Sequence, residues 1–257
     1  MTQAALFGIA ASGIAGAMTG LGGLFVAVSG PPDPRRQNLL IGFAAGVMIA
    51  AAFASLILPA FTQLRLGGTS LVAAGASVAV ALWLGAFAMS RLGLWTETLA
   101  ERGGAWISGI DERRIALFVA AITLHNLPEG MAVGLSFMGQ DPRLGWATML
   151  GIGLQNIPEG LAVAALLASL GWSRARCALA ALATGLVEPL GAAFGVAVAG
   201  ASAAILPWAL AFAAGAMLFV VAAEIIPHTR RQIAHGSATP ALMAGLALML
   251  VLDTALS

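Results

Sequence analysis

Five acidic residues lie within or at the edge of long apolar stretches, where a charged side chain is costly: Glu129, Glu159, Glu188, Glu224 and Asp253. Placing such a charge at the centre of a membrane-spanning helix costs about 2.5–3.5 kcal/mol or more, and a buried carboxylate is normally paired or protonated. No Lys or Arg lies in the middle of an apolar stretch to pair with them. Protons or bound cations must therefore neutralise these carboxylates, which favours an ion pathway over structural salt bridges.

The most specific pattern is an internal repeat whose copies begin thirty residues apart: 125–130 reads His-Asn-Leu-Pro-Glu-Gly, and 155–160 reads Gln-Asn-Ile-Pro-Glu-Gly. In each copy a coordinating side chain precedes the glutamate by four residues, so the two lie on one face of one helix. Because successive membrane helices run antiparallel, the face of His125 and Glu129 can meet that of Gln155 and Glu159. We interpret this set of imidazole, amide and carboxylate groups as a mid-membrane metal site.

The prolines of the repeat supply a second feature. Pro128 cannot donate a hydrogen bond to the carbonyl of Leu124, nor Pro158 to that of Leu154. We expect a kink and a freed carbonyl in each helix, with the following glycine loosening the same turn. Irregular backbone at this depth is tolerated where it lines a cavity, as in the discontinuous helices of many membrane binding sites.

Other residues could join or extend such a site. Asn126 and Asn156 are either second ligands or donors to the freed carbonyls, and the sequence leaves both readings open. Met48 offers a thioether seven residues before Ser55, on the same helical face, although Met in an apolar helix is usually part of the core. Asp253, near the chain end, is interpreted as an interfacial or packing residue. The remaining candidates are acidic or imidazole groups: Glu188, Glu224 and His228.

The elements that must position these residues are membrane helices. The chain of 257 residues is 60% hydrophobic and only 9% charged, whereas a soluble domain carries about 25% charged residues. Its apolar runs can each cross a hydrocarbon layer of about 30 Å. We predict an all-α, polytopic helix bundle with one domain over 1–257, in which kinked fourth and fifth helices form a central metal site. The eight expected spans are 4–29, 39–63, 69–92, 115–138, 145–169, 175–199, 203–226 and 240–256.

Basic residues predict how the chain is oriented. All twelve are Arg, and ten of them fall in the loops of one side, leaving Arg65 and Arg143 on the other. Basic loops stay in the cytoplasm, so we expect both termini on the non-cytoplasmic side. So little chain is left outside the spans that we expect no soluble catalytic domain and no enzyme activity. The net charge of +1 gives no reason to expect a nucleic-acid partner.

Together these motifs resemble the ZIP (Zrt/Irt-like) family of metal transporters, specifically its bacterial, GufA-like branch. The resemblance rests on 125–130, 155–160 and Val-Glu-Pro-Leu-Gly at 187–191, extends to 42–46 and 222–227, and covers almost the whole chain. It implies eight spans with outward termini in a bacterial inner membrane, and transport of divalent metal ions into the cytoplasm. In bacterial relatives the metal-bearing helices are thought to move like an elevator against a scaffold.

The resemblance also implies two adjacent metal positions. The first would be formed by imidazole, amide, carboxylate and thioether groups: His125, Glu129, Gln155, Glu159 and Met48. The second would use Asn126, Asn156 and Glu188, with the repeat glutamates as bridges. Some relatives have Asp at the position of Asn156, and three glutamates cannot balance the charge of +4 of two dications. We therefore expect one strong position with a weaker second beside it.

Another departure from the family concerns the loop between the third and fourth spans, which is His-rich in many relatives. Residues 91–114 contain no histidine. A cytoplasmic hand-over of metal would then rely on other groups, for which Glu224, His228 and His235 are the candidates.

Nitrogen, amide and carboxylate ligands suit Zn²⁺, Fe²⁺, Mn²⁺ and Co²⁺, with Cd²⁺ as a toxic mimic. The ion would be a transported substrate, and no organic cofactor is expected. Because the ligands bind metal in their deprotonated form, acid should reduce uptake. The expected partners are divalent metal ions and membrane lipid, and a homodimer is left open.

Three alternatives use the same residues differently. A metal-selective cation channel would pass ions without a carrier cycle, and a metal sensor would bind ions without flux. An intramembrane metalloprotease would need a motif such as H-E-x-x-H, which does not occur here.

Overall fold

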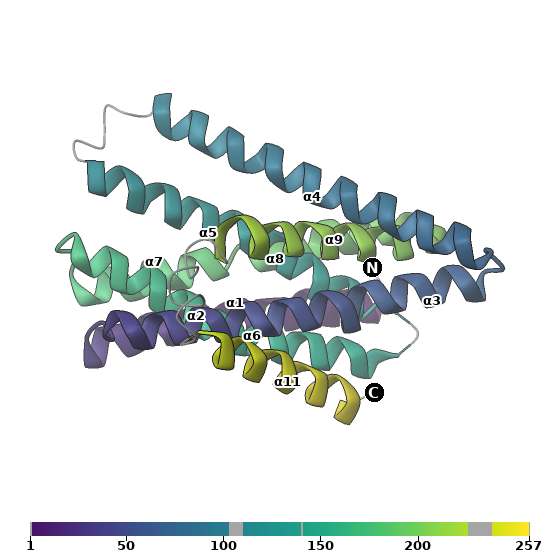
Figure 1. Cartoon of the computed structure of the whole chain (residues 1–257), viewed down its shortest axis with the longest axis horizontal. Helices are drawn as coiled ribbons and strands as arrows, with labels where there is room; N and C mark the ends of the chain where they lie inside the picture. The colour runs from purple at the N-terminus through teal and green to yellow at the C-terminus, as the bar shows by residue number, and fades with distance from the viewer. Residues whose placement is uncertain (1, 103–109, 140, 226–237, 257) are drawn as a thin grey trace.

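A computed structural model describes residues 2–102, 110–139, 141–225 and 238–256, which are helical apart from short turns, with no strand among them (Figure 1). The helices lie along the long axis of the molecule, and both termini are in the same half along that axis. The predicted all-α bundle is therefore confirmed. Its elements in chain order are α1 (Gln3–Ser29), α2 (Pro34–Ala51), the π-helix η1 (Ala52–Ile57), α3 (Leu58–Leu66), α4 (Leu71–Arg102), α5 (Ile110–Ser136), α6 (Pro142–Ser169), α7 (Arg174–Gly185), α8 (Glu188–Ala201), the 3₁₀ turn η2 (Ala203–Ile205), α9 (Leu206–Val220), the π-helix η3 (Val221–Ile225) and α11 (Thr239–Leu256).

Local signals in the sequence set several helix starts. The Asp33 carboxylate accepts the backbone N–H of Arg36 at 3.0 Å, and Asp141 accepts that of Arg143 at 2.9 Å. A proline follows each cap, where its fixed φ suits the first turn and its missing N–H leaves no donor unsatisfied. These caps begin α2 and α6, the second of which carries half of the predicted metal site.

Six of the described helical segments are long and apolar enough to cross a membrane. They are 3–29, 38–66, 71–92, 143–169, 174–201 and 206–223. The site helix α5 and the shorter apolar helix α11 coincide with the fourth and eighth predicted spans but are not among the six.

Three predicted spans contain an interruption or a change of helix type, and in the seventh α9 lies between the 3₁₀ turn η2 and the π-helix η3. The second continues from α2 through the π-helix η1 into α3, so Ser55 lies in a π-helical turn. The sixth is broken at Leu186 and Val187, and α8 begins with Glu188 followed by Pro189. This break places the Glu188 carboxylate at a helix N-terminus, where the helix dipole favours negative charge.

Glycine contacts divide the bundle into two sets of helices. In the first set, Gly16 of α1 faces the backbone of Gly185, and Gly191 of α8 faces that of Leu127 on α5. In the second set, Gly46 of α2 faces the backbone of Leu242 on α11. We call α1, α5, α6, α7 and α8 the site unit, and α2, α3, α4, α9 and α11, with η1, the frame.

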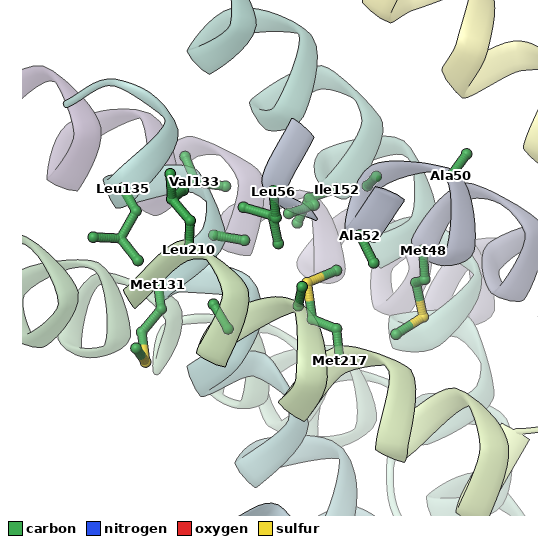
Figure 2. Close-up of a cluster of buried hydrophobic side chains, with 14 of the residues drawn as sticks. Met48, Ala50, Ala52, Leu56, Met131, Val133, Leu135, Ile152, Leu210 and Met217 are labelled. Carbon is green, nitrogen blue, oxygen red and sulfur yellow. The ribbon is translucent and has the colours of Figure 1, made fainter. Parts of the chain in front are cut away.

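Backbone-to-backbone contacts of the described glycines stay within one set or the other. Where Gly151 of the site unit faces the frame, it meets the side chains of Met249 and Val47. The two sets share an apolar core of interlocking side chains (Figure 2), which includes Leu56, Leu210 and Met217 from the frame. Small residues thus let backbones approach within each set, whereas flexible side chains fill the space between the sets.

Candidate metal centre

Helices α5 and α6 bring three of the predicted ligands together. Nε2 of His125 lies 3.2 Å from Oε1 of Glu129 and 3.3 Å from Oε1 of Glu159. One ligand atom from each residue falls within 4.8 Å of the others, and all three side chains are buried. An ion with bonds of about 2.0–2.2 Å to nitrogen and oxygen can bridge atoms at this separation. The helical face of His125 and Glu129 on α5 therefore contacts that of Glu159 on α6, as expected.

Gln155 completes the set from α6. Its amide nitrogen donates to Oε1 of Glu129, and it lies 3.3 Å from Oε1 of Glu159. The amide N–H groups thus face the carboxylates from the side a cation would occupy, while the amide oxygen has no hydrogen-bond partner. Rotating the amide by half a turn would present that oxygen as a ligand.

The two asparagines fasten the repeats to neighbouring helices. Nδ2 of Asn126 donates to the carbonyl of Thr184 on α7 at 2.7 Å. Nδ2 of Asn156 donates to the carbonyl of Ala15 on α1 at 2.9 Å and to Oε1 of Glu188 at 2.5 Å. Both asparagines thus donate to backbone carbonyls. These carbonyls belong to neighbouring helices and are not those of Leu124 and Leu154, which precede the repeat prolines by four residues. Glu188 is brought beside the repeat of α6 by the same amide.

The glycine of each repeat is needed for close helix contact. A Cβ on Gly130 would overlap the backbone carbonyl of Glu188, and one on Gly160 would overlap that of Thr19. Both α5 and α6 continue as helices past their prolines. Close approach gives the two glycines a role that the sequence interpretation missed. The kinks and freed carbonyls stay predictions.

Unpaired polar atoms concentrate at this site. Within the described part of the chain, nine buried side-chain N or O atoms have no hydrogen-bond partner, and seven of them belong to six residues. Buried polar groups are nearly always satisfied, so a cluster of exceptions indicates groups arranged for another ligand. The six residues are His125, Asn126, Glu129, Gln155, Glu159 and Glu188.

Electrostatics favours a cationic ligand. Three glutamates approach one another in the buried interior, and the ion pairs described for Glu129 and Glu159 involve only the imidazole of His125. Several carboxylates in a low-dielectric interior cannot all be charged without a compensating cation or proton. The site therefore has the composition of a buried divalent-cation site with an imidazole ligand.

The other predicted residues lie on other elements or outside the described residues. Met48 of α2 is fully buried in the apolar core that the two sets share, and its role as a ligand stays a prediction (Figure 2). Oγ of Ser55 donates to Oδ1 of Asp253 at 3.3 Å, a contact that joins η1 to α11. Asp253, interpreted as an interfacial or packing residue, thus has a specific polar partner. The side chain of Glu224 and all of His228 and His235 lie outside the described residues.

The sequence interpretation missed one wall of the site. Ser12 and Thr19 of α1 are buried, and their hydroxyls are the two remaining unpaired atoms. Between them lies Ala15, whose carbonyl holds Asn156. Ser12, Ala15 and Thr19 share one helical face by their spacing. The two hydroxyl residues on this face of an apolar helix were the sequence signal that could have placed α1 at the site.

Comparisons with known proteins agree with this description. The ZIP zinc transporter family profile matches residues 108–253. The chain is 43% identical to the zinc transporter GufA of Myxococcus xanthus, over 97% of this chain and 98% of that protein. It is 45% identical to the zinc transporter ZIPB of Bordetella bronchiseptica, over 93% of this chain and 78% of that protein. It is 34% identical to the zinc transporter ZupT of Chlorobium phaeovibrioides, over 92% of both chains.

The matches extend over nearly the whole chain, and the six apolar helices make it an integral membrane protein. With the repeat ligands gathered in its interior, the chain belongs to the ZIP family, among its bacterial members.

Proposed function

We propose that this chain carries divalent transition-metal ions, Zn²⁺ foremost, across the membrane into the cytoplasm through the cluster of His125, Glu129, Gln155 and Glu159. The observation that carries the proposal is the buried group of ligand atoms within 4.8 Å of one another. The zinc transporters among its relatives support the same substrate class. Fe²⁺, Mn²⁺, Co²⁺ and Cd²⁺ are further substrates that this ligand set suits.

Mixed ligands of moderate strength suit transport, since an ion must leave as well as bind. Nitrogen and oxygen donors fit borderline ions, and the chain's one cysteine, Cys177, does not belong to the cluster. Protons compete with metal for the carboxylates and the imidazole. Uptake should therefore fall on acidification.

A second, weaker metal position would lie beside the first, formed by Asn126, Asn156 and Glu188 with the repeat glutamates as bridges. Asn156 supports only a weak position, because its N–H group faces the Glu188 carboxylate that a second ion would need. The unpaired amide oxygen of Asn126 is its best neutral ligand.

In the proposed topology, eight spans cross a bacterial inner membrane with both termini on the non-cytoplasmic side. The position of both termini in one half of the molecule is compatible with an even number of spans (Figure 1). The exposed arginines Arg35, Arg36, Arg174 and Arg176 then lie at the cytoplasmic ends of helices, as the preference of basic residues for the cytoplasm requires.

The proposed mechanism is an elevator-like carrier in which the site unit moves against the frame. The distribution of contacts supports it: backbones meet within each set, and flexible side chains meet between the sets. A unit held together by backbone contact can move as one body. Met48, Ser55 and Asp253 belong to the frame, which would stay in place while the site unit moves. Met48 and Ser55 would therefore contact the transported ion during only part of the transport cycle.

The alternative is a metal-selective channel that uses the same residues. Uptake by a carrier saturates at low metal concentration and depends weakly on voltage. A current that rises without saturation and depends steeply on voltage would favour the channel.

The decisive experiment is Zn²⁺ uptake by proteoliposomes containing the wild type, Glu129→Ala or Glu159→Ala. Each variant should lose at least about tenfold of the uptake rate, since even indirect changes at metal sites cost that much. Asp33→Asn is the control, because it removes an exposed carboxylate away from the cluster while the Asn side chain keeps the acceptor that caps α2. Unchanged uptake by either glutamate variant would refute the proposed site.

A further inference from the structure

A second polar group joins α5 to α6 outside the metal cluster. Oγ1 of Thr148 lies 3.2 Å from Oγ of Ser136, and both side chains are buried. Ser136 donates to the carbonyl of Ala132 in its own helix at 2.7 Å, and Thr148 donates its one proton either to Ser136 or to the carbonyl of Leu144 at 2.8 Å. A hydroxyl has one proton and two lone pairs, so these bonds use the protons and leave oxygen lone pairs free.

The hydroxyl pair lies on the same helical faces as the cluster. Ser136 follows Glu129 by seven residues on α5, and Thr148 precedes Gln155 by seven on α6. Seven residues bring a helix back to within about 20° of the same direction and about 10 Å further along. Ser136 and Thr148 therefore form a second polar level, displaced from the cluster toward the end of the bundle where α5 ends and α6 begins.

A cavity reaches Ser136, whereas Thr148 contacts the Ser136 hydroxyl and is not among the lining residues. The cavity has a volume of about 150 Å³, and its polar lining comes from Ser136, Ser55, Thr62, Gln63 and Asp141. A buried water needs about 10–15 Å³ of such volume, so the cavity can hold several waters and an ion that carries part of its hydration shell. Asp141 supplies the single carboxylate of the lining.

A thin apolar layer separates the two levels. Ala132 of α5 and Ile152 of α6 lie between them along the helices, and both are fully buried. Ile152 belongs with Leu56 and Leu210 to the core that fills this region (Figure 2). An ion in the cavity is thus about two helical turns from the cluster and separated from it by side chains.

We propose that the Ser136 hydroxyl, held in place by Thr148, forms with the cavity a low-affinity site for a partly hydrated divalent cation, occupied before the ion reaches the cluster. The inference rests on the proposed transport function. The Ser136 oxygen accepts a water hydrogen or replaces a water ligand, so the ion loses hydration in two stages. Neutral oxygens suit this role because they bind weakly enough to release the ion again.

The test compares Ser136→Ala/Thr148→Val with the wild type in Zn²⁺ uptake and in equilibrium Zn²⁺ binding. The double variant should raise the KM for uptake about three- to tenfold, the range expected for one or two lost hydrogen bonds. Maximal rate and equilibrium affinity should stay near wild type, because the cluster is intact. Ser136→Thr and Thr148→Ser keep the hydroxyls and should restore the wild-type KM.

Thr123→Val is the matched control, since this α5 hydroxyl makes the same bond to its own helix, to Val119 at 2.7 Å. An unchanged KM in the double variant, or an equal rise in the control, would overturn the proposal. If the double variant does not fold, Ser136→Ala alone decides, with a KM rise of about two- to threefold for one hydrogen bond. Failure of the transport function itself would appear separately, as uptake insensitive to Glu129→Ala.

Discussion

The two copies of the repeat, one on α5 and one on α6, are fastened alike but offer different ligands. In each, the asparagine donates to a backbone carbonyl of a neighbouring helix, and the glycine lies against another such carbonyl. The first residue differs, being His125 on α5 and Gln155 on α6. The repeat thus keeps the groups that fix each helix and varies those that would face the proposed ion.

A second difference concerns the asparagines. Asn156 also donates to Glu188, whereas Asn126 leaves its amide oxygen unpaired. The copy on α6 therefore ties down a third carboxylate, and the copy on α5 keeps a free neutral ligand. The second metal position proposed beside the main cluster would therefore have a free amide oxygen on the α5 side and an amide N–H group on the α6 side.

The largest effect is expected from the shared glycines. Gly130→Ala and Gly160→Ala each place a Cβ against a backbone carbonyl that cannot move aside, and overpacking of this kind costs about 1–3 kcal/mol or more. Both variants should give less folded protein and a lower unfolding temperature in detergent. Gly75→Ala on α4 is the control, because nothing lies within 4 Å of its Cβ position. Equal stability of all three would refute the close contact of both glycines, and a loss in only one of the two copies would break their likeness.

An intermediate effect is expected from exchanging the ligands. His125→Gln leaves two amides at the cluster and should weaken Zn²⁺ binding about tenfold or more, in line with changes at other metal sites. Gln155→His adds an imidazole, which should tighten binding and slow turnover. Competition with a metal-sensitive dye and initial uptake rates measure the two effects. If both exchanges shifted the Zn²⁺ affinity in the same direction, the number of imidazole ligands would not determine that affinity.

The smallest effect on uptake is expected from the asparagines, which separate the copies more finely. Asn156→Asp replaces the N–H group facing Glu188 with a carboxylate and should raise bound Zn²⁺ from one toward two ions per chain. Asn126→Asp places a carboxylate against the carbonyl of Thr184 and should destabilise the fold without adding an ion. Metal analysis of purified protein counts the ions. One ion in both variants would mean that Asn156 does not limit the second position.

The meeting of the repeat residues was predictable because it depends on local rules. A spacing of four residues puts His125 and Glu129 on one face, and antiparallel neighbours bring that face to Glu159. The asparagine contacts were not predictable, since Asn156 and Ala15 are 141 residues apart and the sequence contains no signal for their pairing. The π-helical turn at Ser55 depends likewise on packing against other helices.

Within the frame, the close pairing of α2 with α11 has a consequence for how the protein is made. Gly42 and Gly46 of α2 lie against Ala238 and Leu242 at the start of α11, and the same edge is closed by Ser55 and Asp253. During synthesis α2 enters the bilayer about 200 residues before this partner exists, and pairing at such sequence separation is slow. A chain that stops after 225 can assemble the site unit, yet it leaves the glycine face of α2 open to lipid or to other proteins. Quality control of this protein should therefore depend on α11.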